Sequence, residues 1–220
     1  LSANEVESKL LPGFARLGLD PAQVKIILVA HGHADHFGGA AYFQQRFGSG
    51  VYVSAADWDL MEAPARGRGP APGAAAPPKR DANLEEASPV TLGDVTVRVV
   101  AVPGHTPGSM GFVFPVLDRG QKHVAALFGG SWLTPGLLND EAMGTFINSV
   151  ARFKEATRNA GVDAWLQNHP LMVPFQEWVT RLGARGRSDP NPLVVGAAPY
   201  QRFLDVLDGC SRVALERRRQ

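Results

Sequence analysis

The alternation of apolar and polar positions predicts helices and a strand in the first third of the chain. Residues 3–18 carry apolar side chains three and four positions apart, which predicts a helix with one buried face that ends at Gly18. Those side chains are Val6, Leu10, Phe14 and Leu17. Residues 24–30 form a short apolar run, typical of a buried strand. The pattern then predicts a helix over 39–47, a strand over 51–54 and a short helix over 55–61.

From residue 88 onward the pattern changes to short alternating runs. These predict strands over 90–92, 95–102, 110–116 and 123–128, with a tight turn at Gly93-Asp94. A helix is expected over 146–160, with Ile147, Val150, Phe153 and Ala156 buried, followed by a strand over 164–167 and helices over 174–182 and 200–217. Strands flanked by helices indicate an α/β layered fold. We expect a single domain over 1–220, with a mobile Pro/Gly-rich loop at 63–78.

The composition argues against several kinds of partner and against an internal disulfide. The 220 residues are 45% hydrophobic and 20% charged, with a formal net charge of +1, so nothing favours a nucleic-acid partner. No apolar run approaches the roughly 20 residues that span a bilayer, so we expect no membrane partner. Cys210 is the only cysteine, which excludes an internal disulfide; its spacing places it on the apolar face of the last helix, where we expect a buried, inert thiol.

Four potential metal ligands follow the first predicted strand within six residues: His31, His33, Asp35 and His36. In an extended segment, residues two apart point the same way, so His31 and His33 can meet one metal. Gly38-Gly39 lets the chain turn, and Asp35 and His36, past the bend, would address a second metal. Imidazole and carboxylate groups are the ligands that zinc takes in catalytic sites.

Two further histidines stand at strand ends. His105 lies between Pro-Gly and Thr-Pro-Gly, and His169 lies between Asn168 and Pro170. Alone, each would be read as a turn or core histidine; beside the His-x-His-x-Asp-His run, both become candidate ligands. His123 lies inside a predicted strand without a companion, and we expect an ordinary exposed or half-buried residue.

Four motifs in this order resemble the metallo-β-lactamase superfamily: His31-x-His33-x-Asp35-His36, Pro103-Gly-His105-Thr-Pro-Gly, Gly129-Gly-Ser131 and Asn168-His169-Pro170. The third subclass of zinc β-lactamases is the most similar. The resemblance implies an αββα sandwich with two metals at the sheet edge. The first strands of that family lie upstream of the helix with which this chain opens, so we expect an N-terminally truncated version. If a signal peptide precedes the chain, we expect a periplasmic or secreted protein.

The resemblance also implies roles. His31, His33 and His105 would hold one Zn²⁺ ion, and Asp35, His36 and His169 would hold a second. Asp35 and Ser131 would be catalytic, in a monomer whose metal-bound hydroxide attacks the carbonyl of a small molecule. Opening of a β-lactam ring, and with it antibiotic resistance, is the first expectation. Most of the superfamily has a metal-bridging Asp where this chain has Ser131; a hydroxyl is a poor zinc ligand, so we expect it to hydrogen-bond a metal-held water or a ligand.

Alternatives remain. The chain could be an ester, lactone or thioester hydrolase of the same fold, or an inactive fragment that only binds metal. A mononuclear iron dioxygenase is disfavoured because it would leave the second ligand set unused. In the third subclass, a small hydroxyl residue two positions after the serine helps to hold the substrate carboxylate. Leu133 stands there in this chain, next to Thr134, which weighs against β-lactam recognition.

Overall fold

The structure is a computed structural model that describes residues 2–63, 76–132 and 138–218. The chain divides into two compact units, residues 1–84 and 85–220, and each is described by itself. Most of the Pro/Gly-rich segment predicted as a mobile loop, residues 64–75, lies outside the described residues, as do Leu133 and Thr134. Among the helices that are described, none combines the length and the hydropathy that a membrane crossing requires.

The first unit opens with an interrupted helix. It comprises α1 (Ala3–Glu5), the π-helical segment η1 (Val6–Leu10) and α2 (Leu11–Arg16), which together cover the predicted helix except for its last two residues. Pro12 has no N–H to donate into the preceding turn, and the wider π-helical turn lies just before it. Gly18 ends the helix in a left-handed conformation, with φ 66°. Val6 is buried, but Leu17 is 75% exposed, so the predicted apolar face is buried only in part.

A three-stranded parallel sheet follows, in the order β1-β2-β3. Its strands are β1 (Ile26–Leu28), β2 (Gly50–Val53) and β3 (Ala82–Asn83). The connecting helices are η2 (Pro21–Gln23), α3 (Ala34–Phe37), α4 (Ala40–Phe47) and α5 (Ala55–Glu62). Val29, Phe37, Val51, Val53 and Trp58 form the core of this unit. The core therefore fixes both ends of the segment that carries the first four candidate ligands.

The second unit is built on a five-stranded sheet in the order β4-β5-β6-β7-β8. The strands are β4 (Val90–Leu92), β5 (Val95–Ala101), β6 (Met110–Asp118), β7 (Gln121–Leu127) and β8 (Ala164–Leu166). All neighbours pair antiparallel except β7 and β8, which pair in parallel. Since β5 and β7 both run antiparallel to β6, the strands β5, β7 and β8 end at the same edge of the sheet.

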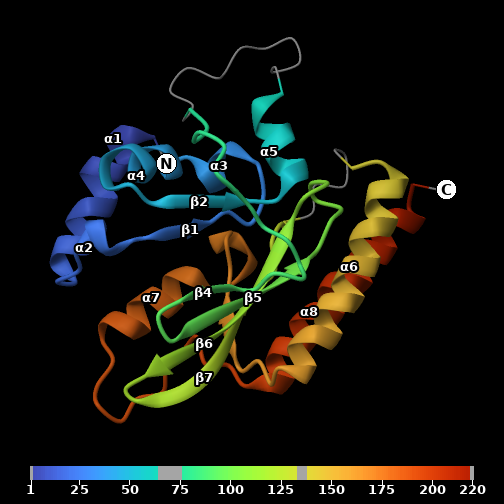
Figure 1. Cartoon of the computed structure of the whole chain (residues 1–220). Coiled ribbons are helices and arrows are strands. Elements are labelled where there is room, and N and C mark those ends of the chain that lie inside the picture. The colour runs from blue at the N-terminus through green and yellow to red at the C-terminus, as the bar shows by residue number, and fades with distance from the viewer. Residues whose placement is uncertain (1, 64–75, 133–137, 219–220) are drawn as a thin grey trace. The chain divides into compact units, whose positions relative to one another are not determined.

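Helices α6 (Asp140–Asn159) and α8 (Ala197–Glu216) run side by side and pack on this sheet (Figure 1). Phe146, Val150 and Phe153 of α6 and Leu204 of α8 are buried against Phe128 and its neighbours in the sheet. The buried positions predicted for the helix over 146–160 are confirmed. Helix α6 nevertheless begins at Asp140, because the side chain of Asn139 caps its first turn. The remaining helices are η3 (Pro170–Met172) and α7 (Phe175–Gly183).

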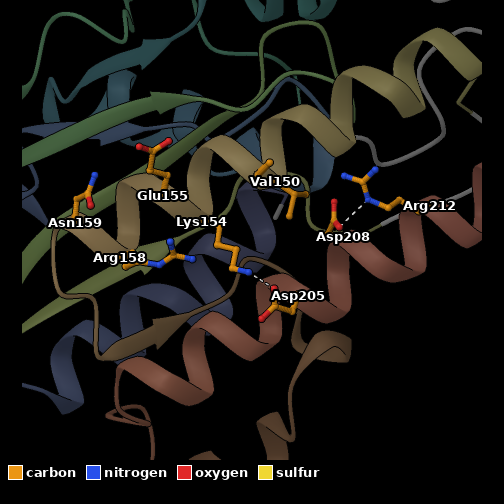
Figure 2. Close-up of a pocket in the computed structure, with 9 residues that line it drawn as sticks. Val150, Lys154, Glu155, Arg158, Asn159, Asp205, Asp208 and Arg212 are labelled. Atoms are coloured by element: carbon orange, nitrogen blue, oxygen red, sulfur yellow. Dashed lines mark hydrogen bonds and ion pairs between the residues drawn. The ribbon is translucent and has the colours of Figure 1, made fainter.

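A hollow of about 410 Å³ follows the outer side of the α6–α8 pair (Figure 2). Lys154 pairs with Asp205 across the two helices, and Arg212 pairs with Asp208 within α8. Glu155 and Arg158 complete a set in which cations and anions are equal in number. The balanced charges indicate that this hollow is a solvated seam between the two helices rather than a charged ligand site.

Two sequence-based expectations in this unit are wrong. Cys210 is exposed rather than buried, because the inward face of α8 runs through Leu204, Leu207 and Ser211 and leaves the thiol one position off it. His123 is buried and has a companion: its Nδ1 lies 2.6 Å from Oδ2 of Asp163, whose other oxygen accepts the N–H of Val124. This pair ties β7 to the start of β8, so His123 has a structural partner.

Candidate metal and catalytic site

The loop after β1 gathers three imidazoles. The ring centroid of His31 lies 3.8 Å from that of His36 and 5.0 Å from that of His33. His31 is fully buried, His36 is half-buried and His33 is exposed. The expectation that His31 and His33 share an extended segment is wrong, since residues 30–33 form a bend; the bend itself brings the two rings together. The grouping of donor side chains suits a soft-to-borderline cation such as zinc.

A one-turn helix places the other two candidates of this loop. His33 occupies the N-cap position of α3 (Ala34–Phe37), and the N–H of His36 donates to the carbonyl of His33 at 2.9 Å. The carboxylate of Asp35 is exposed and lies 3.2 Å from Nε2 of His36. Asp35 and His36 are therefore adjacent in space as well as in sequence.

Asp57 supports this loop, and the sequence reasoning missed it. Its side chain is fully buried, and Oδ2 accepts the backbone N–H of Gly32 at 2.7 Å. Ser54 caps the helix that carries Asp57, accepting the Asp57 N–H through its hydroxyl. A Cβ at Gly32 would lie 2.9 Å from the Asp57 carbonyl oxygen, so the residue between the two histidines has to be small. A buried carboxylate that anchors the backbone between two candidate ligands is typical of the support that metal sites use.

In the second unit, a tight loop between β5 and β6 carries His105. The Val102 N–H donates to the Ser109 carbonyl at 2.8 Å and closes the loop. Inside it, the Thr106 N–H donates to the Ser109 hydroxyl at 3.1 Å, and the two hydroxyls lie 2.7 Å apart. Ser109 is thus a buried turn residue. The loop is also held from α6, where the Ser149 hydroxyl donates to the Pro103 carbonyl.

Glycines let the backbone pack against His105. Gly130 follows β7 with φ +79°, and a Cβ there would lie 2.6 Å from Cβ of His105. Gly104 has φ +130°, and a Cβ there would lie 2.6 Å from the backbone of Phe146. Side chains at either position would displace the His105 loop. The Gly-Gly-Ser and Pro-Gly-His motifs therefore pack directly against each other, with Gly130 against His105.

Ser131 and His169 lie at the same edge of the sheet. Ser131 is fully buried and donates its hydroxyl proton to Oε1 of Gln167 at 2.9 Å, which joins the segment after β7 to the segment after β8. His169 is half-buried at the N-cap of η3, and its ring centroid lies 6.1 Å from that of Trp132. Gln167 gave no signal in the sequence, because its role depends on a residue 36 positions away.

The candidates thus form two groups, each placed within one unit. The loop after β1 carries His31, His33, Asp35 and His36, and the edge formed by the ends of β5, β7 and β8 carries His105, Ser131 and His169. Both groups offer the donor types that zinc takes. The roles assigned to these residues stay predictions.

Solved structures share this fold. BJP-1, a subclass B3 metallo-beta-lactamase of Bradyrhizobium japonicum, is 23% identical, with a TM-score of 0.77 over 99% of this chain and 82% of that one. The FEZ-1 metallo-beta-lactamase of Legionella gormanii is 18% identical, with a TM-score of 0.79 over 95% of this chain and 80% of that one. These likenesses confirm the metallo-β-lactamase type of α/β fold expected from the motifs.

Curated relatives are matched over part of their length. A hydroxyacylglutathione hydrolase of Acidiphilium cryptum is 34% identical over 88 residues, which is 40% of this chain and 30% of the relative. An uncharacterized protein of Mycobacterium tuberculosis is 34% identical over 122 residues, 52% of each chain. The chain therefore spans about half or less of the curated relatives named here.

The sequence profile of the metallo-beta-lactamase superfamily matches residues 2–118, more than half of the chain. That range contains five of the six predicted metal ligands, from His31 to His105. Members of the superfamily are metal-dependent hydrolases. With the profile match and the shared fold, the chain belongs to the metallo-beta-lactamase superfamily.

Proposed function

We propose that this protein is a zinc-dependent hydrolase that cleaves the single bond between a carbonyl carbon and its leaving group in a small molecule, with the amide C–N bond of a β-lactam ring as the first candidate. The observation that supports this most directly is the crowding of three imidazoles in the loop after β1, within 3.8 and 5.0 Å of the buried His31 ring. Imidazole is the commonest metal ligand in proteins, and such a group next to a carboxylate is typical of a catalytic zinc site.

The proposed ligand sets are those of the sequence. His31, His33 and His105 would hold one zinc ion, and Asp35, His36 and His169 the other. When bound, zinc polarises a carbonyl oxygen and lowers the pKa of water toward neutrality. Asp35, whose exposed carboxylate lies beside His36, would orient the attacking hydroxide as well as hold the second ion. Ser131, whose hydroxyl proton is engaged by Gln167, would offer its lone pairs to a water or to a donor group of the substrate.

A thioester hydrolase is the second candidate. The similarity to a hydroxyacylglutathione hydrolase favours it, over the 40% of this chain that the match covers. The presence of Ser131 in place of a metal-bridging carboxylate weighs against it, since a neutral hydroxyl contributes little to holding two cations together. Both candidates share the metal chemistry and differ in the substrate.

Metal content and two substrates test the proposal. The purified chain would be loaded with zinc, dialysed and analysed by mass spectrometry, then assayed with nitrocefin and with S-lactoylglutathione. We expect two zinc ions per chain and turnover of nitrocefin. Turnover of the thioester alone would replace the first candidate with the second, and a zinc-loaded chain without turnover of either would contradict the hydrolase proposal.

Two histidine substitutions, one at a proposed ligand and one outside the proposed ligand sets, serve as test and control. His105→Ala should abolish turnover and lower the zinc content, because it removes a proposed ligand. His123→Gln alters the one histidine that is outside the proposed ligand sets and pairs with Asp163 instead, so the folded variant should keep two zinc ions. Equal zinc loss in both variants would mean that His105 acts through the fold rather than as a ligand.

A further inference from the structure

An apolar cavity of about 270 Å³ lies in the second unit, next to the end of β7. We call it the α8 cavity. Its lining residues come from the segment after β7, from η3 and from α8: Ser131, Trp132, Met172, Phe203, Val206, Leu207 and Cys210. None of these residues is charged. The polar hydrogens of their side chains are those of the Ser131 hydroxyl, the Cys210 thiol and the Trp132 indole N–H.

One wall of the α8 cavity is built from residues of the candidate site. Ser131 is itself a proposed catalytic residue, and the ring of Trp132 lies 6.1 Å from the ring of His169. The N–H of Met172 donates to the carbonyl of His169 at 3.3 Å. A group bound in the cavity would therefore contact the neighbours of a proposed metal ligand.

The part of the lining that belongs to α8 is partly open. Leu207 is buried, whereas Val206 is 63% exposed and Cys210 is exposed. Phe203 is held in place by Trp165, with ring centroids 4.4 Å apart. Water in an apolar-lined space finds few hydrogen-bond partners, so an apolar group that displaces it binds favourably. An apolar cavity of ~150 Å³ holds benzene, so the α8 cavity has room for an aromatic ring and a short linker.

We infer that the α8 cavity binds an uncharged aryl or alkyl substituent of the carbonyl substrate, and so makes this enzyme selective for substrates that carry one. The inference rests on the proposed hydrolase function. The shared wall with Ser131 and His169 favours a substrate group over other occupants, because it puts the bound group beside the proposed chemistry. The lack of charged lining residues disfavours a charged substituent.

Matched substrates test this selectivity. Benzylpenicillin and 6-aminopenicillanic acid share the same β-lactam ring and differ in the phenylacetyl group; phenylacetyl and acetyl thioesters of glutathione form a second pair. We expect kcat/KM to be at least about tenfold higher for the phenylacetyl member of whichever pair is cleaved, the order of discrimination that an apolar pocket supplies. In Val206→Asp this ratio should fall about tenfold, because the variant places a carboxylate on the cavity wall.

Val213→Asp is the control. Val213 is 52% exposed on the same helix and does not line the cavity, so the same substitution there should leave the ratio unchanged. A ratio near one in the wild type, or an equal fall in both variants, would overturn the inference.

Cys210 gives a readout that is independent of turnover. It is the only cysteine, and it lines the cavity, so its rate of reaction with a thiol reagent reports on occupancy. Phenylacetamide should slow this reaction severalfold, acetamide should not, and Val206→Asp should abolish the protection. Protection without turnover of any substrate would support the cavity as a binding site and contradict the proposed function. Turnover without protection, or a concentration-dependent dimer that Val206→Asp dissociates, would overturn the inference.

Discussion

The carboxylate of Asp57 holds the backbone of Gly32 through a 2.7 Å hydrogen bond, and both residues are buried. Gly32 stands between His31 and His33, so this bond fixes the conformation of the segment that presents both imidazoles. It also ties the loop after β1 to α5, 25 residues further along the chain. The position of the histidines is thus set by a residue that has no place in the ligand motif.

Asp57→Ala should make the loop after β1 less rigid. The substitution leaves the buried Gly32 N–H without its acceptor, which costs about 1–3 kcal/mol of folding free energy. We expect zinc affinity to fall 10–100-fold, as is usual for the loss of a group that supports a ligand. Competition with a chromophoric chelator measures the affinity, and urea unfolding measures the stability.

Asp59→Ala is the matched control on the same helix. Asp59 is exposed and pairs with Arg80 at 2.8 Å, so its loss should cost about 0–1 kcal/mol and leave zinc affinity unchanged. If Asp57→Ala behaved like this control, Asp57 would have no part in positioning the ligand loop.

Gly130→Ala should displace His105. The new Cβ would lie 2.6 Å from Cβ of His105, and the residue would also have to adopt φ +79°. Gly120→Ala imposes a similar backbone strain, at φ +85°, with nothing within 4 Å of the new Cβ. The strain alone costs about 1–2 kcal/mol. We expect Gly120→Ala to lose about that much stability, and Gly130→Ala to lose more and to release zinc faster on addition of a chelator.

Identical unfolding midpoints for the two glycine variants would show that the Gly130–His105 contact relaxes without cost. In that case the Val102–Ser109 closure and the Ser149–Pro103 hydrogen bond would keep His105 in position without this contact. Zinc release separates the two explanations, because Gly120 lies in the β6–β7 turn, away from the His105 loop.

Local patterns predicted the helices and strands well, because these depend on residues close in sequence. The apolar period of α6 and the end of the first helix at Gly18 are examples. Three of the errors and omissions come from contacts that are distant in sequence. His123 looked unaccompanied because Asp163 is 40 residues away, and Asp57 and Gln167 act on residues 25 and 36 positions distant. Cys210 was misplaced by one position, which on a helix turns a side chain by about 100°.

Acid should weaken the second unit through Asp118. Arg185 donates to both carboxylate oxygens of Asp118, at 2.7 and 2.5 Å, and these hydrogen bonds lower the pKa of Asp118. The unfolded chain therefore takes up the proton more readily than the folded chain. The contribution of the Asp118–Arg185 pair to the free energy of unfolding is complete above the ordinary Asp pKa of about 4. It is lost as the pH falls toward the lowered pKa that Asp118 has in the folded protein.

Asp118→Asn should thus lower the unfolding midpoint at neutral pH and reduce the further loss of stability below about pH 4. Asp94→Asn, in the turn between β4 and β5, serves as the control and should follow the wild-type pH profile. Thermal unfolding of the metal-free protein across pH 2–7 gives the comparison. Parallel profiles for wild type and Asp118→Asn would contradict the role of the Asp118–Arg185 pair.

Substitutions of Ser131 distinguish a metal ligand from a residue that orients water. Ser131 is buried and already donates its proton to Gln167, which leaves only a neutral lone pair for a cation. Because Asp35, His36 and His169 would supply three ligands to the second ion, Ser131→Ala should keep two zinc ions and lower turnover modestly. A drop to one ion would identify Ser131 as a ligand.

Ser131→Asp is the sharper test. A carboxylate at this position could bridge two ions, so zinc should be retained longer against a chelator. The added negative charge would also raise the pKa of the zinc-held water and repel a substrate carboxylate, so β-lactam turnover should fall and its pH profile should move to higher pH. Acetyl and lactoyl thioesters of a neutral thiol, which lack that carboxylate, should be affected less. If the β-lactam rate and the zinc retention both stayed at wild-type values, Ser131 would face away from the metals, and the proposed link between this serine and the substrate would be wrong.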